Sequence, residues 1–160
     1  MKLTVFGAAR TVTGSMILIE YGGKKLLLEC GTFQGKREES YFTNLNFPFN
    51  PAEIDAMILS HAHIDHSGNI PNLVKQGFKG KIYATNATVD LADIMLRDSG
   101  HIQENDIKYL NKNRRKKNQP PLEPIYTQKD ALAAMPHFRM VWYNVAFEPI
   151  PGIKARLIEA

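Results

Sequence analysis

The sequence lacks several features that would place it in a specialised class of protein. It holds one cysteine, Cys30, which rules out a disulfide within the chain and fits a reducing cytoplasm. No apolar run approaches the ~20 residues that span a bilayer, and residues 1–7 resemble a strand rather than a signal peptide. Internal repeats and low-complexity tracts are also absent. We therefore expect a cytoplasmic protein that has no membrane partner.

The composition is otherwise that of an ordinary globular domain. A chain of 160 residues is long enough for one domain with a hydrophobic core. Its hydrophobic share of 44% and charged share of 22% are typical of such domains. The net charge of +4 favours acidic partners such as nucleic acid, although charge alone is a weak indication.

Apolar spacing and turn residues predict an α/β fold with a mixed sheet. We expect strands over residues 3–6, 14–21, 24–29, 54–59, 80–84, 139–147 and 153–158, and helices over residues 67–78, 85–110 and 127–135. The dipeptide Gly22-Gly23 is typical of a tight antiparallel hairpin. The order strand, helix, strand over residues 54–84 indicates a parallel pair with a crossover helix. Gly100 is expected to interrupt the long helix, and residues 112–121 to form a loop.

A cluster of metal-ligating residue types directly follows the strand expected over residues 54–59. Three of the chain's five histidines lie within six residues here: His61, His63 and His66. His61 and His63 alternate, so in extended backbone their imidazoles leave on the same side and can chelate one divalent ion. Asp65 and His66 lie where the chain bends into the next helix, and they can reach a second ion beside the first.

This pattern favours hydrolytic chemistry at two metal ions. Two ions ~3.5–4 Å apart are a recurring device for hydrolysis, because they bind both the attacking hydroxide and the departing oxygen. A bound metal also lowers the pKa of its water to ~7, which supplies a nucleophile at neutral pH. Imidazole and carboxylate ligands without a thiolate favour zinc, with manganese or iron as alternatives.

The motif and its flanks resemble a known family. Residues 61–68, His-Ala-His-Ile-Asp-His-Ser-Gly, resemble the signature of the metallo-β-lactamase fold. The stretches GAARTVTGS at residues 7–15 and LLECGTFQG at residues 27–35 resemble the β-CASP branch of that fold, which contains RNA-processing nucleases. The resemblance implies an α/β, αββα sandwich, of which this chain supplies the first half as a mixed sheet with helices.

The resemblance also implies a role for each residue of the motif. His61 and His63 would bind one zinc ion, and Asp65 and His66 the other. Asp65 would be the catalytic residue as well, by handling the proton of the attacking water. Glu29 stands where the family usually has an aspartate that supports the histidine loop through hydrogen bonds. Glutamate is one methylene longer, so that support must be rearranged or lost.

The resemblance covers essentially the whole chain but only part of the family's catalytic domain. Residues 1–160 correspond to the N-terminal part of a metallo-β-lactamase domain, without the β-CASP insertion and the C-terminal half. The motif supplies at most two ligands per ion, where a catalytic zinc takes three protein ligands. We expect the intact enzyme to cleave RNA phosphodiesters, preferably single-stranded, through a metal-bound hydroxide, and this fragment to be inactive. Uncovered sheet surface in a half domain also predicts a homo-oligomer.

Two other functions stay open at this point. The first is a metallo-hydrolase that acts on a small ester or thioester, because a fold alone does not fix the substrate. The second is a non-catalytic fragment that binds metal or only self-associates.

A basic run is a further candidate for RNA binding. Its cations are Lys112, Arg114, Arg115, Lys116 and Lys117, which fall within six residues and could contact phosphates. Such a run is also typical of a solvated helix end, and no aromatic residue is interleaved with it for stacking.

Overall fold

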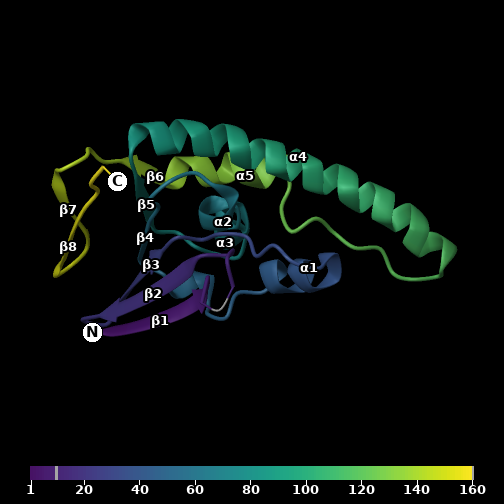
Figure 1. The fold of residues 1–160 in the computed structure, drawn as a ribbon, viewed down its shortest axis with the longest axis horizontal. Helices are drawn as coiled ribbons and strands as arrows, with labels where there is room; N and C mark the ends of the chain where they lie inside the picture. Colours follow the sequence, from purple (N-terminus) through teal and green to yellow (C-terminus); the bar gives the residue numbers. More distant parts are fainter. Residues whose placement is uncertain (10, 160) are drawn as a thin grey trace.

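Strands β1–β6 form one mixed sheet and β7–β8 form a separate hairpin (Figure 1). A computed structural model describes residues 1–9 and 11–159, and for Arg37 and Glu38 the backbone alone. The strands are β1 Lys2–Gly7, β2 Met16–Tyr21, β3 Lys24–Leu28, β4 Ala56–Ile58, β5 Lys81–Ala84, β6 Phe138–Met140, β7 Ala146–Ile150 and β8 Ile153–Arg156. The helices are α1 Arg37–Leu45, α2 Ile64–Ser67, α3 Ile70–Lys75, α4 Asn86–Lys116 and α5 Gln128–Ala134, with 3-10 turns at Pro51–Glu53 and Met135–His137.

The strand order in the main sheet follows the sequence from β1 to β6. The first three strands pair antiparallel, and β3 to β6 pair parallel. Gly22 and Gly23 make the β2–β3 turn with φ values of 57° and 76°, which glycine adopts without strain. The antiparallel start and the parallel crossover between β4 and β5 are therefore both confirmed.

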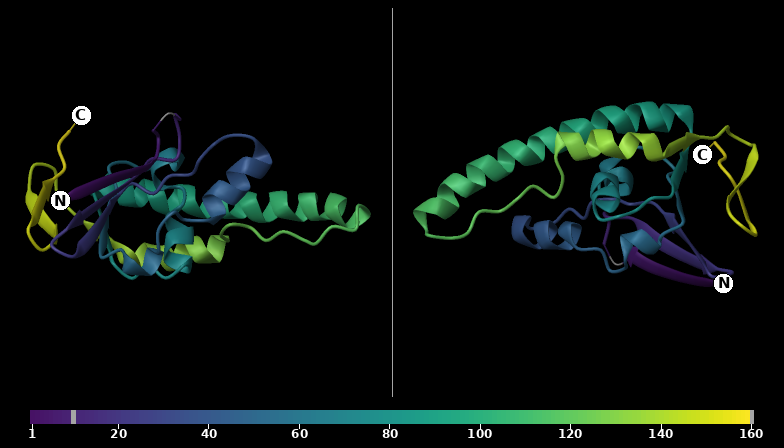
Figure 2. Two further views of the ribbon diagram at one scale, coloured as in Figure 1. Left: turned by 90° about the horizontal axis from the view of Figure 1, so that it is seen from below. Right: turned by 180° about the vertical axis from the view of Figure 1, so that it is seen from behind.

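The central strands face two different cores, because their side chains alternate between the two faces of the sheet. Leu27 and Met57 are fully buried on the face that the helices cover. Leu26 and Ile58 point the other way and pack with Ile150 of β7. Helices α2 to α5 thus lie on one face and the β7–β8 hairpin on the other, which gives three layers (Figure 1, Figure 2).

Helix α4 runs without a break through Gly100, so the expected interruption is wrong. A Cβ at Gly100 would lie 2.7 Å from the Gln128 nitrogen and 2.8 Å from the Thr127 carbonyl carbon. The glycine is needed because α5 approaches α4 there, and this packing offsets a helix-propensity cost of about 1 kcal/mol. Residues 112–116, expected in a loop, also belong to the helix. Like the other helices of the described residues, α4 is not both long and apolar enough to cross a membrane.

We expect Gly100→Ala to lower the free energy of unfolding by about 1–3 kcal/mol, although alanine is the better helix former. The nearest atoms belong to the backbone of Thr127 and Gln128, so they cannot rotate aside as a side chain could. Urea denaturation measures the change, with Asp98→Ala at an exposed position of the same helix as the control. A stabilised Gly100→Ala protein would contradict the close approach of the two helices.

Three other boundaries differ from the sequence-based expectations. The strand expected over residues 139–147 is two strands, because Asn144 turns the chain with a φ of 62° and separates β6 from β7. The helix expected over residues 67–78 begins earlier and is two short helices, since Asn69 leaves helical geometry between α2 and α3. Helix α1, Arg37–Leu45, lies in a stretch where no helix of this length was expected.

Candidate metal centre

The histidine segment lies at the carboxyl edge of the parallel strands, directly after β4. Leu59 extends the strand pairing, because its N–H donates to the Tyr83 carbonyl at 2.9 Å. Helix α2 then begins with His63 at its N-cap position. His61 and His63 therefore leave non-helical backbone, whereas Asp65 leaves the first turn of α2. Ligand sites in open α/β sheets are typically found at this edge.

A buried serine closes the bend between β4 and α2. Ser67 is fully buried, and its hydroxyl donates to the Ala62 carbonyl at 2.8 Å. The backbone N–H groups of His66 and Ser67 both donate to the His63 carbonyl at 2.9 Å. Ser67 carried no functional prediction from the sequence, although it directly follows the last histidine of the motif.

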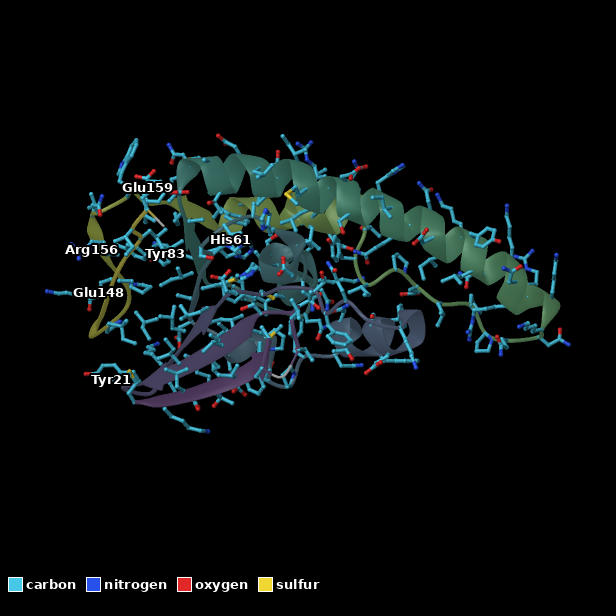
Figure 3. All side chains as sticks on the ribbon, viewed as in Figure 1. Tyr21, His61, Tyr83, Glu148, Arg156 and Glu159 are labelled. Carbon is cyan, nitrogen blue, oxygen red and sulfur yellow. The ribbon has the colours of Figure 1, made fainter. Side chains whose placement is uncertain are left out.

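The four residues predicted as metal ligands lie in one cluster. The ring centroid of His61 is 4.8 Å from that of His63 and 4.1 Å from that of His66. Figure 3 shows His61 beside α2. The Asp65 carboxylate completes the cluster, with its Oδ2 3.5 Å from His66 Nε2. The bend therefore brings imidazole and carboxylate donors together although they leave the chain from different kinds of backbone.

Glu29 reaches the same cluster from the end of β3. Its Oε1 accepts a hydrogen bond from the Ser60 N–H at 3.1 Å, and its Oε2 lies 3.5 Å from His66 Nδ1. The Glu29 backbone has a φ of 61°, a left-handed conformation that is uncommon and strained for a residue with a side chain. The Ser60 hydroxyl in turn lies 2.8 Å from His61 Nδ1. The longer glutamate side chain thus still contacts the histidine segment.

Two buried atoms at this contact have no hydrogen-bond partner: Glu29 Oε2 and His66 Nδ1. They are 3.5 Å apart, and an Nδ1–H directed at the carboxylate is the arrangement that serves both. That tautomer leaves the lone pair of His66 Nε2 free, which is how histidines backed by a carboxylate bind metals. The types of donor therefore suit a divalent ion, although no three His, Cys, Asp or Glu donors converge on one point within the part of the chain that the structure describes.

Burial shifts the pKa values of two groups in the cluster. It raises the pKa of the Glu29 carboxyl, and hydrogen bonds from Ser60 oppose that shift. Burial also lowers the pKa of His61, and the neighbouring His66 lowers it further. Because the neutral imidazole is the form that binds a metal, the shift at His61 favours ligation near neutral pH.

The loops after β1 and β3 hold α2 against the sheet. The Ser15 N–H donates to the Asp65 carbonyl at 2.8 Å. Gly31 passes so close to α2 that a Cβ there would lie 1.6 Å from the Asp65 carbonyl oxygen. The loop of residues 7–15 therefore ends beside the cluster. Arg10, which is part of that loop's sequence pattern, lies outside the described residues.

The basic run lies apart from this cluster. Its members Lys112, Arg114, Arg115, Lys116 and Lys117 stand at the C-terminal end of α4, which extends beyond the rest of the molecule (Figure 1). The histidine segment lies instead by the sheet, next to α2. The cluster and the basic run are thus two separate candidate sites.

Comparison with known proteins gives the family of this fold and site. A model of the metallo-beta-lactamase superfamily matches residues 9–137. The chain therefore belongs to the metallo-beta-lactamase superfamily. Among solved structures, it is similar to Zn(2+)-bound PqqB from Methylobacterium extorquens, with a TM-score of 0.48 and 18% identity over 92% of this chain and 42% of that one.

Three relatives narrow the resemblance within the superfamily. The chain is 39% identical to Ribonuclease TTHA0252 of Thermus thermophilus over 144 residues, which are 90% of this chain and 29% of that protein. It is 29% identical to Transcription termination factor FttA of Methanocaldococcus jannaschii, covering 100% of this chain and 23% of FttA. With Integrator complex subunit 11 of Danio rerio it shares 33% identity over 61% of this chain and 17% of that subunit. The chain spans less than a third of each relative. Together these findings confirm the resemblance to the β-CASP branch.

Proposed function

We propose that this chain is the part of a zinc-dependent RNA phosphodiesterase that carries its histidine motif. The main support is the cluster of three imidazoles with Asp65 at the carboxyl edge of the sheet. The chain's membership of the metallo-beta-lactamase superfamily and its likeness to a protein named as a ribonuclease agree with this activity. Single-stranded RNA is the proposed substrate.

The proposed ligands are His61, His63, Asp65 and His66. When bound, zinc would supply a Lewis acid that activates water near neutral pH and stabilises charge on phosphate oxygens. Glu29 would orient the ring of His66 by accepting from its Nδ1–H, since the two atoms lie 3.5 Å apart. Asp65 would accept the proton of the attacking water, because its side chain is 31% exposed at the surface of the cluster. Manganese and iron are the alternatives to zinc for this set of donors.

Four donors are too few for two catalytic zinc ions, each of which ordinarily takes three protein ligands. We propose that cleavage requires further segments of the kind that make up the remaining length of the relatives. Residues 1–160 by themselves would then bind metal and cleave no RNA. A labelled single-stranded RNA, incubated with the 160-residue chain and with the full-length protein, separates the two forms.

Zinc binding by the 160-residue chain is expected to have modest affinity and to weaken by at least about 100-fold in the His61→Ala/His63→Ala double variant. Isothermal titration of zinc into the metal-free chain measures both. The matched control is His101→Ala/His137→Ala, which removes the same number of imidazoles from positions outside the cluster. Equal zinc affinity in the first double variant and in the parent chain would overturn the ligand assignment.

The substrate is tested separately from the metal. RNA cleavage by the full-length protein, with slow turnover of a nitrophenyl ester or a thioester, would support the proposal. Fast ester or thioester hydrolysis without RNA cleavage would favour the small-molecule hydrolase. Zinc binding without either activity would favour a non-catalytic protein.

Self-association stays a prediction, motivated by Leu3 and Val5 on the edge strand β1, which are 55% and 49% exposed.

A further inference from the structure

One segment of the chain carries all of its excess positive charge. Residues 107–122, the arm, contain six Lys or Arg residues and no Asp or Glu. Since the whole chain has a net charge of +4, the residues outside the arm carry a net charge of −2. The basic character of this protein is therefore local, and a local concentration of cations is typical of a polyanion site. The arm is the end of α4 and the segment that folds back from it (Figure 1, Figure 2).

The inner side of the arm is occupied by contacts that hold it together. Asn111 makes two hydrogen bonds with the Leu122 backbone, both at 2.8 Å. Arg114 donates from Nε to the Pro120 carbonyl at 2.7 Å. Ile107 is buried on the same side. Arg114 therefore helps to hold the arm in its folded-back shape, and we assign it a positioning role.

The outer side of the arm carries an aromatic ring beside cations. Tyr109 is 66% exposed, and Lys112 and Lys116 are exposed as well. These residues follow one another at intervals of three and four, which places them on one helix face with neighbouring Cβ atoms ~5–6 Å apart. Tyr109 precedes the basic run in the sequence, so only the helical geometry of α4 shows that a ring lies among the cations. Within the described residues, no cation of the arm forms an ion pair with a carboxylate.

We propose that the outer side of the arm binds single-stranded RNA through Tyr109, Lys112 and Lys116. Tyr109 would stack on one base, and the two lysines would contact phosphates on either side of that nucleotide. An aromatic ring beside cations is the usual arrangement for single strands, whose unpaired bases are free to stack. This inference rests on the proposed RNA-cleaving function. The arm lies at the end of α4 away from the histidine cluster, so it would hold RNA outside the site without touching the cleaved bond (Figure 1).

The test is the affinity of the full-length protein for a fluorescently labelled single-stranded RNA, measured by anisotropy in EDTA over a series of salt concentrations. Lys112→Gln/Lys116→Gln is expected to reduce the slope of log affinity against log salt by about 1.4, which is ~0.7 for each phosphate contact. Tyr109→Ala is expected to weaken binding about tenfold at every salt concentration, while Tyr109→Phe keeps the stack and the affinity. The control Lys79→Gln/Lys129→Gln removes two exposed lysines elsewhere and should leave the slope unchanged.

Affinity for inorganic polyphosphate, which has phosphates but no bases, separates the contribution of base stacking from that of charge. The Lys112→Gln/Lys116→Gln protein should bind it more weakly, whereas Tyr109→Ala should bind it like the parent. Parental RNA affinity in Tyr109→Ala, or an equal change of slope in the control, would overturn the proposal. So would a stronger, lysine-dependent affinity for phosphatidylserine vesicles than for RNA. If the full-length protein cleaves RNA but the arm substitutions leave RNA affinity unchanged, only the proposed role of the arm is contradicted. If the protein binds RNA through the arm but cleaves none, only the proposed function is contradicted.

Discussion

RNA cleavage by the full-length protein is expected to fall by about 1,000-fold or more when Asp65 is replaced by asparagine. Asp65 lies on the first turn of α2, with its Oδ2 3.5 Å from His66 Nε2. Asparagine has nearly the same shape, so the bend and the helix should persist. It lacks the negative charge that binds a cation and the basic oxygen that accepts a proton. The loss should therefore appear in the rate of cleavage rather than in RNA affinity.

The matched control is Asp90→Asn, which removes one carboxylate from an exposed position of α4. Single-turnover cleavage of a labelled RNA gives the rate, and the zinc content of each purified protein shows whether the metal is retained. The cleavage rate of the Glu29→Gln protein is expected to fall by about 10- to 100-fold, between the rates of the Asp65→Asn and Asp90→Asn proteins. This substitution weakens the support of a ligand rather than removing one. Parental cleavage by a zinc-loaded Asp65→Asn protein would exclude Asp65 as the group that handles the proton.

Local patterns in the sequence were sufficient to predict much of the fold. A capping box between Thr127 and Asp130 starts α5, and such a cap needs only four consecutive residues. At the start of the 3-10 turn Pro51–Glu53, the Asn50 side chain likewise accepts from the Ala52 N–H at 3.1 Å. The alternation of Leu26 and Leu27 between two cores follows from the period of a strand. In each case the residues that determine the structure are neighbours in the chain.

Contacts between segments that are distant in the sequence explain the places where the sequence-based predictions were wrong. Gly100 was expected to break a helix, but its role is to admit α5, and no residue near Gly100 signals that contact. The strand expected across Asn144 is divided because β6 pairs with β5 while β7 packs on β3 and β4. Apolar spacing alone does not distinguish these two partners. Residues 107–116 were divided between a helix and a loop, although they contain neither glycine nor proline.

The closeness of the four proposed ligands could be predicted from the sequence, because all four lie within six residues. The residues that hold the cluster in place were not predictable in this way. Ser67 closes the bend through a carbonyl five residues earlier, and Ser60 links Glu29 to His61 across two strands. Tyr109 can be placed beside the cations of the basic run only when this part of α4 is known to be helical. Sequence spacing thus predicted the proposed donors, and the fold was needed to find the residues that contact them.

Gly31→Ala is expected to weaken zinc binding by at least about tenfold and to lower the free energy of unfolding by about 1–3 kcal/mol. The new Cβ would lie 1.6 Å from the Asp65 carbonyl oxygen and 2.7 Å from the His66 nitrogen. Both are backbone atoms, so α2 itself would have to move. That movement would break the hydrogen bond from the Cys30 N–H to the His66 carbonyl, which is 2.7 Å long. Two of the four proposed ligands are carried on this turn, so the metal affinity should fall together with the stability.

Gly35→Ala is the matched control in the same loop. Its Cβ would meet the ring of Phe33 at 2.7 Å, and a ring at the end of a side chain can rotate aside. Zinc titration and urea denaturation of both variants separate the two effects. Parental zinc affinity in a destabilised Gly31→Ala protein would show that the position of α2 does not control the cluster. Equal losses in the two variants would assign the effect to the loop as a whole. A loss confined to Gly31→Ala would mean that the contact of this glycine with α2 places Asp65 and His66 for the metal.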